Sequence, residues 1–125
     1  MSGAAERPWL SCQVEILAPG RALVCPCGEI DIASLSILES ALSEAFAAGA
    51  EQVIVDLRQV GFLDSEGVKC LLGTWSRLGT RPPRLVVVAP TSCFAYRVLR
   101  LLGLTDVVPV VETPEEALAI LRVAQ

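Results

Sequence analysis

The chain has no histidine among its 125 residues. Histidine supplies the general base of Ser-His-Asp and Cys-His nucleophile systems and is a frequent metal ligand. Its absence excludes these sites from the chain alone. A serine or cysteine nucleophile would need a base from a carboxylate, the single lysine or another protein. We therefore do not expect an enzyme that uses a serine or cysteine nucleophile of this chain alone.

Basic residues and long apolar runs are also scarce. One lysine and nine scattered arginines face 14 acidic residues, for a net charge of -4, so no basic stripe offers itself to nucleic acid. No stretch approaches the roughly 18 apolar residues of a membrane span. The opening MSGAAERPWL lacks the apolar core of a signal peptide. We expect a cytoplasmic protein with no membrane span and no direct nucleic-acid partner.

The five cysteines form an odd set in a chain without an export signal. This usage indicates reduced and mostly buried thiols, because a disulfide framework needs pairs and an oxidising compartment. Cys25 and Cys27 flank Pro26 in a C-P-C pair, too few ligands for a zinc site. We expect no metal and no other cofactor. A redox-sensitive edge at this pair is the alternative to simple structural variation, which we favour.

Hydrophobic residues make up 53% of the chain, which suffices for one core in a chain of this length. The polar start predicts a flexible N-terminal segment over residues 1–11, followed by one domain over residues 12–125. That domain begins with two apolar runs, CQVEILA and RALVCPC. Pro19 and Gly20 between them favour a turn, so the runs predict a β-hairpin.

Strands and helices then alternate. Spacing of three and four residues predicts a helix from Ala33 to Gly49, and VIVDL predicts a central strand. An apolar stripe from Val68 to Leu78 predicts a helix that begins near Ser65 and ends at Gly79. LVVVA predicts a buried strand, and VVPVV predicts a short edge strand. Thr91 or Ser92 is the expected cap of the next helix, and Thr113 with Glu116 forms a capping box for the last. This order predicts an α/β fold, with a mixed, mostly parallel sheet of four to five strands flanked by about four helices.

The segment FLDSEGVKCLL places Asp64, Ser65 and Glu66 where the second helix begins. Asp and Ser are common helix caps, so a strand-to-helix corner explains the stretch. A hydroxyl at a helix N-terminus is also a place where a phosphate is tolerated, because free N–H groups and the helix dipole favour negative charge. The residues alone leave both interpretations open.

Ser65, Lys69 and Gly73 follow one another at four-residue steps on the solvent face of the same helix. A charge and a bare glycine beside the hydroxyl fit the docking of a partner. A solvated lysine and a glycine that costs about 1 kcal/mol relative to alanine explain them equally well. We expect Asp56 to have a capping or turn role and Trp75 to pack in the core.

Four stretches occur in an order known from one family: GEIDIAS, VIVDLRQVGFLDSEGVKCLL, RVLRLLGL and ETPEEAL. From Val14 to Leu121 the chain resembles the STAS domain family, specifically the bacterial anti-sigma factor antagonists. The resemblance implies a single STAS domain that binds an anti-sigma factor and so releases a sigma factor for transcription. Such a protein switches partners and catalyses nothing itself.

In that family the anti-sigma factor is usually also a serine kinase. The resemblance implies that this kinase phosphorylates Ser65, that phosphorylation switches the antagonist off, and that a metal-dependent serine phosphatase removes the phosphate. The added charge would repel a closely docked partner without unfolding the domain. The partner-binding residues that we predict from the motif and the helix face are Asp31, Asp64, Ser65, Glu66, Gly67, Lys69 and Gly73.

Glu66 departs from the family pattern, in which a small or hydroxyl residue commonly follows the serine. An acid beside Ser65 either weakens recognition by a generic kinase or tunes it to a particular one. The alternative function within the family is a STAS scaffold, or a module that binds a lipid or nucleotide, in a larger signalling or transport assembly.

Overall fold

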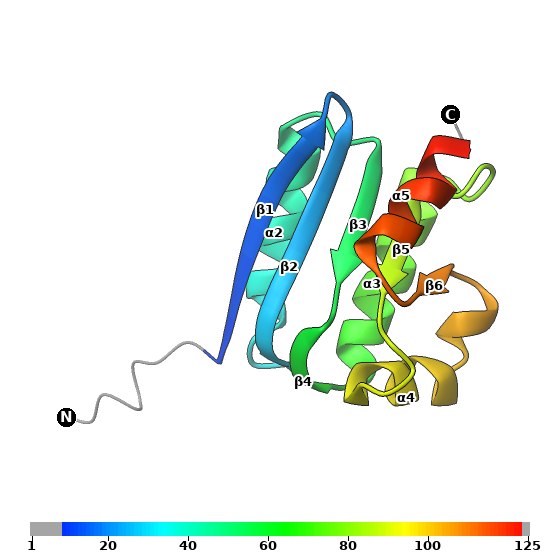
Figure 1. Cartoon of the computed structure of the whole chain (residues 1–125). Helices are drawn as coiled ribbons and strands as arrows, with labels where there is room; N and C mark the ends of the chain where they lie inside the picture. The colour runs from blue at the N-terminus through cyan, green and yellow to red at the C-terminus, as the bar shows by residue number, and fades with distance from the viewer. Residues whose placement is uncertain (1–8, 124–125) are drawn as a thin grey trace.

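The computed structural model describes residues 9–123. Within this range six strands form one sheet, and four α-helices pack on it (Figure 1). The elements are β1 (Leu10–Ala18), β2 (Arg21–Ile30), α2 (Leu35–Ala47), β3 (Gln52–Asp56), β4 (Gln59–Leu63), α3 (Ser65–Leu78), β5 (Leu85–Val88), α4 (Phe94–Leu101), the 3-10 turn η1 (Leu104–Asp106), β6 (Val110–Val111) and α5 (Pro114–Val123).

The expected α/β class is confirmed. The sheet has one strand more than the four or five expected, because β4 lies between the predicted strand VIVDL and the helix after it, where no strand was expected. β1 begins at Leu10, two residues before the expected domain boundary. Residues 1–8, most of the segment expected to be flexible, lie outside the described residues.

The sheet has the strand order β1-β2-β3-β5-β6, and β4 pairs with a different part of β2 from β3. β1 and β2 form the expected antiparallel hairpin, and the other pairs are parallel. β2 pairs with β3 over Arg21–Val24 and with β4 over Cys27–Ile30. Pro26 lies between these two stretches, where a missing N–H breaks neither ladder. The strand therefore passes through its proline and changes partner there.

Helices cover the two faces of the sheet unequally. Figure 1 shows α5 in front of the sheet, with α2 and α3 behind it. The larger core cluster joins Leu38 of α2, Leu71 of α3 and Leu99 of α4 to the strands, whereas the smaller one joins Ile54 of β3 to Leu121 of α5. Every residue of β3 is buried, as expected for a strand covered on both sides.

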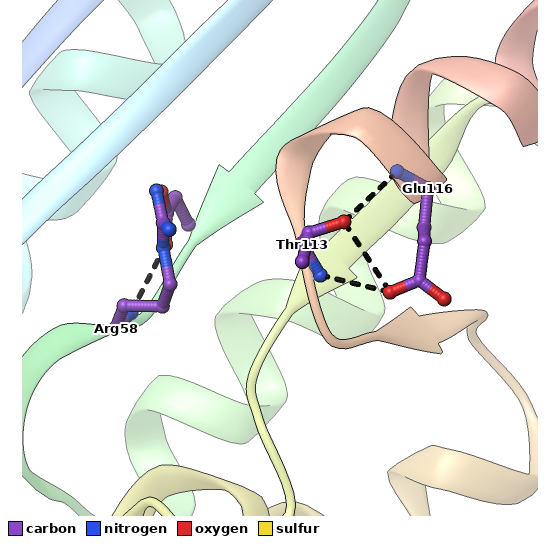
Figure 2. A network of polar contacts seen from close by, with 4 residues as sticks. Arg58, Thr113 and Glu116 are labelled. Atoms are coloured by element: carbon purple, nitrogen blue, oxygen red, sulfur yellow. Dashed lines mark hydrogen bonds and ion pairs between the residues drawn. The ribbon is translucent and has the colours of Figure 1, made fainter.

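The last helix begins as its sequence indicates. The Glu116 N–H donates to Thr113 Oγ1 at 3.2 Å, and the Thr113 N–H donates to Glu116 Oε1 at 3.1 Å, which confirms the capping box (Figure 2). The expected cap of α4 at Thr91 or Ser92 is wrong. A turn in which the Cys93 N–H donates to the Pro90 carbonyl at 2.9 Å delays the helix, so Cys93 becomes its N-cap without a side-chain bond.

All five thiols are free, and Cys27 alone is exposed, while the other four are half-buried. Burial raises the pKa of the Cys12 thiol and of the Cys70 thiol to about 11. Both groups are therefore neutral and weakly nucleophilic near pH 7. Trp75 packs against the larger core cluster, as expected. None of the helices in residues 9–123 combines the length and apolar character needed to cross a bilayer.

Candidate functional site

The candidate site lies where two neighbouring parallel strands end. Ile30 of β2 is the register partner of Leu63 of β4, and the Asp64 N–H donates to the Ile30 carbonyl at 3.1 Å. Asp31 and Asp64 each follow directly after these partners. The structure therefore brings the GEID loop and the DSEG corner together at the carboxyl edge of the sheet, where open α/β folds commonly bind their ligands.

Asp64, and not Ser65, caps α3. Its Oδ1 accepts hydrogen bonds from the N–H of Glu66 at 2.9 Å and from the N–H of Gly67 at 3.3 Å. Ser65 is the first residue of the helix, its side chain is exposed, and within residues 9–123 its hydroxyl makes no hydrogen bond. The corner therefore uses the acid for capping and leaves the hydroxyl free for another role.

Replacing Asp64 with alanine should lower the free energy of unfolding by about 1 kcal/mol, because two N–H groups of the first turn lose their acceptor. Asp64→Asn should lose less, since an amide oxygen accepts the same bonds. Urea unfolding monitored by circular dichroism measures both changes. Equal stability of wild type and Asp64→Ala would contradict the assignment of the cap.

Gly67 holds the start of α3 against the strands. It is buried, and a Cβ atom at this position would overlap Leu63 Cδ1 and lie 2.8 Å from Ile30 Cγ2. Both side chains are almost fully buried and have little room to move. Gly67 therefore lies beneath the predicted partner surface and not on it, and it sets how closely Ser65 approaches the strand ends.

Glu66 and Lys69 form an ion pair on the exposed side of α3, with Lys69 Nζ 3.1 Å from Glu66 Oε2. An acid in the first helical turn and a cation three residues later stabilise a helix by a few tenths of a kcal/mol. This pairing gives Glu66 a local structural role. Gly73 is also exposed, with open space where a Cβ would lie, and it lines a groove between α2 and α3.

Asp31 shapes the loop that leads into α2. Its Oδ1 accepts hydrogen bonds from the N–H of Ala33 at 2.9 Å and from the N–H of Ser34 at 3.0 Å. Ser34 Oγ in turn donates to the Glu29 carbonyl at 2.6 Å. These bonds fix a tight turn. Ile32, within this turn, is 76% exposed.

An exposed pair of aromatic side chains, which the sequence did not reveal, includes Phe62, two residues before Asp64. Phe62 and Phe94 are each 40% exposed, and their rings stack with centroids 5.9 Å apart. Strict alternation along β4 would turn Phe62 to the same side as the buried Val60. The ladder skips Gly61, since Gly28 pairs with Val60 and Glu29 with Phe62, and this bulge turns Phe62 outward. A glycine inside a strand was the available signal.

Asp56 ends β3 farther along the same edge. Its buried carboxylate accepts from the Arg58 N–H at 3.1 Å and binds the guanidinium through two side-chain nitrogens, with Arg58 Nη2 2.8 Å from Oδ2 (Figure 2). The expected turn role is confirmed. Within the part of the chain that the structure describes, no three Cys, Asp or Glu side chains lie close enough together to hold a metal ion.

A hairpin followed by alternating strands and helices, with an Asp-Ser corner at the carboxyl edge, defines the class of domain. The chain belongs to the STAS domain family, whose model matches residues 16–117. The resemblance that the four sequence stretches carry is thus confirmed.

Particular relatives agree with this assignment. The anti-sigma-F factor antagonist RsfB from Mycobacterium tuberculosis is 34% identical over 95 residues, which cover 76% of this chain and 76% of RsfB. The crystal structure of an anti-sigma factor antagonist from Mycobacterium paratuberculosis aligns with a TM-score of 0.79 and 32% identity, over 90% of this chain and 94% of that one. Unphosphorylated SpoIIAA shares the fold, with a TM-score of 0.71 at 24% identity over 90% of this chain and 96% of its own.

Proposed function

We propose that this protein is an anti-sigma factor antagonist, which binds an anti-sigma factor in the cytoplasm and is switched off by phosphorylation of Ser65. It acts as a binding protein and not as an enzyme. The observation that carries the proposal is the Ser65 hydroxyl, which makes no hydrogen bond within the described residues and is exposed at the start of a helix whose cap is supplied by Asp64. The 34% identity to RsfB, an anti-sigma-F factor antagonist, supports the same class of partner.

The docking surface that we propose combines an uncharged hydroxyl with apolar flanks. These flanks are Ile32, exposed in the loop after β2, and the stacked, exposed Phe62 and Phe94 of β4 and α4. Exposed apolar side chains around a small polar group favour close, dehydrated contact with a partner. Asp31 and Gly67 position the two loops from within, while Lys69 and Gly73 extend the surface along α3.

A phosphate on Ser65 would change this surface strongly. It adds about -1.5 to -2 charges beside Asp64 and Glu66. The N–H groups of Glu66 and Gly67 already donate to the Asp64 carboxylate, and Lys69 is already paired with Glu66, so these donors are occupied before a phosphate is added. The helix dipole keeps the modified domain folded, whereas a partner in close contact must desolvate the new charge. Release of the partner follows, and a serine phosphatase would reset the switch.

Affinity capture with the full chain from its native cell tests the class of partner. We expect recovery of an anti-sigma factor with a serine-kinase ATPase domain, and a phosphorylated Ser65 in the population that does not bind it. Mass spectrometry identifies both. Recovery of membrane transport proteins in its place would favour the alternative of a STAS module in a transport assembly and contradict the proposal.

The apolar flanks give a separate prediction. Replacing Phe94 with serine should weaken binding of the anti-sigma factor about tenfold or more, because a truncated aromatic anchor typically costs at least 1–2 kcal/mol. Val123 is exposed at the far end of α5, so Val123→Ser is the matched control and should bind as wild type does. Isothermal titration calorimetry measures both affinities. An equal loss of affinity in the two variants would show that these apolar side chains are not part of the docking surface.

A further inference from the structure

β1 is a long edge strand that lacks the features that usually protect a sheet edge from pairing. It spans nine residues at one end of the sheet, and within residues 9–123 no strand pairs with its outer side. Natural sheets protect such edges with lysine, proline or short strands. Leu10–Ala18 contains neither lysine nor proline, and its one charge is Glu15. The register shift near Ala18 leaves the rest of the strand regular.

The pairing with β2 shows which backbone groups point outward. The Glu29 N–H donates to the Trp9 carbonyl at 2.9 Å, so this pair is hydrogen bonded. Cys12 lies opposite Pro26, which has no N–H to give, and Val14 lies opposite Val24. In an antiparallel ladder bonded and non-bonded pairs alternate. The N–H and C=O groups of Cys12, Val14 and Ile16 therefore point away from β2, toward the outer side of the edge, where no strand lies within residues 9–123.

The helix above this edge leaves room for a second helix. α2 packs over both β1 and β2, so the α2 of a second copy joined edge to edge would lie about two strand spacings away, roughly 10 Å. That is the usual distance between packed helices. On the side of α2 that faces the edge, the small residues Ser36, Ser40 and Ala41 lie beside Ile37 and Glu44. A shallow groove of about 300 Å³ runs there, lined by Cys12, Ser36, Ile37, Ser40, Ala41 and Glu44.

We propose that two copies of this chain associate through β1, which joins their sheets into one and packs α2 against α2. A two-fold axis at Val14 places Glu15 opposite Gln13 of the second copy and Cys12 opposite Ile16. Glu15, the single charged residue of the strand, therefore does not lie opposite Glu15 of the second copy. Ile16, 49% exposed in one copy, becomes covered. The Ser65 surface lies at the carboxyl edge of the sheet, away from this axis, so this inference stands independently of the proposed function.

Sedimentation velocity of the full chain, from low to high micromolar concentration, tests the pairing. We expect a particle of twice 13.3 kDa to form as concentration rises. Ser40→Arg, on the side of α2 that faces the edge, should raise the dimer dissociation constant about tenfold or more. Ser43→Arg is the matched control, because Ser43 lines the groove on the α3 side of the same helix. It should leave the constant unchanged.

Val14→Pro removes an outward N–H and should also weaken the dimer about tenfold or more. Thermal melts followed by circular dichroism establish that each variant is folded. If Val14→Pro melts early, the Ser40 and Ser43 pair decides the question by itself. A wild-type chain that stays monomeric at every concentration, or a dimer that Ser40→Arg weakens no more than Ser43→Arg does, overturns the proposal.

Discussion

Ser65→Asp should bind the anti-sigma factor about a hundredfold more weakly than wild type, whereas Ser65→Ala should bind nearly as well. A charge forced into a close interface without a counter-ion costs several kcal/mol, and about 2.8 kcal/mol corresponds to a factor of one hundred. Alanine removes only a hydroxyl that makes no hydrogen bond within residues 9–123. Isothermal titration calorimetry with the purified anti-sigma factor measures both affinities.

Ser76→Asp is the matched control for this experiment. Ser76 is exposed on the same helix, near its other end, so an added carboxylate there changes the net charge equally but lies far from the DSEG corner. It should leave the affinity unchanged. Equal affinities of Ser65→Ala and Ser65→Asp would contradict the proposed switch by charge. Equal losses of affinity in Ser65→Asp and Ser76→Asp would show that the effect is a nonspecific one of net charge.

The predictions that were confirmed rest on local signals. The capping box at Thr113 and Glu116 depends on residues three apart, and the buried β3 shows as an unbroken apolar run. The start of α3 is likewise marked by a change of hydrophobic period. Each signal is complete within about one turn or one strand, so no distant contact is needed to interpret it.

What the sequence did not reveal depends on residues far apart in the chain. The outward turn of Phe62 follows from a skipped residue in the pairing of β4 with β2, more than thirty positions earlier. Phe94 joins it only because α4 packs beside β4. The choice between Asp64 and Ser65 as the cap was undecided for a different reason. Both residue types cap helices well, and only backbone geometry distinguishes them.

Gly67 could be predicted only in part. Its place in the motif is visible in the local sequence, but the reason that this position requires glycine lies in tertiary contacts. Gly67→Ala should lower the free energy of unfolding by about 1–3 kcal/mol, because the new Cβ would overlap side chains of Ile30 and Leu63 that are already tightly packed. Either α3 moves away from the strand ends or the core is strained. Movement of the helix would displace Ser65, so its rate of phosphorylation by the kinase should fall as well.

Gly73→Ala on the same helix gives the matched comparison. Open space surrounds the site of its Cβ, so alanine there should raise the free energy of unfolding by about 0.5–1 kcal/mol through helix propensity alone. Urea unfolding of the two variants measures the opposite signs, and a kinase assay on each separates stability from positioning. If Gly67→Ala were as stable as Gly73→Ala and as good a substrate as wild type, the close packing at Gly67 would have no part in presenting the serine.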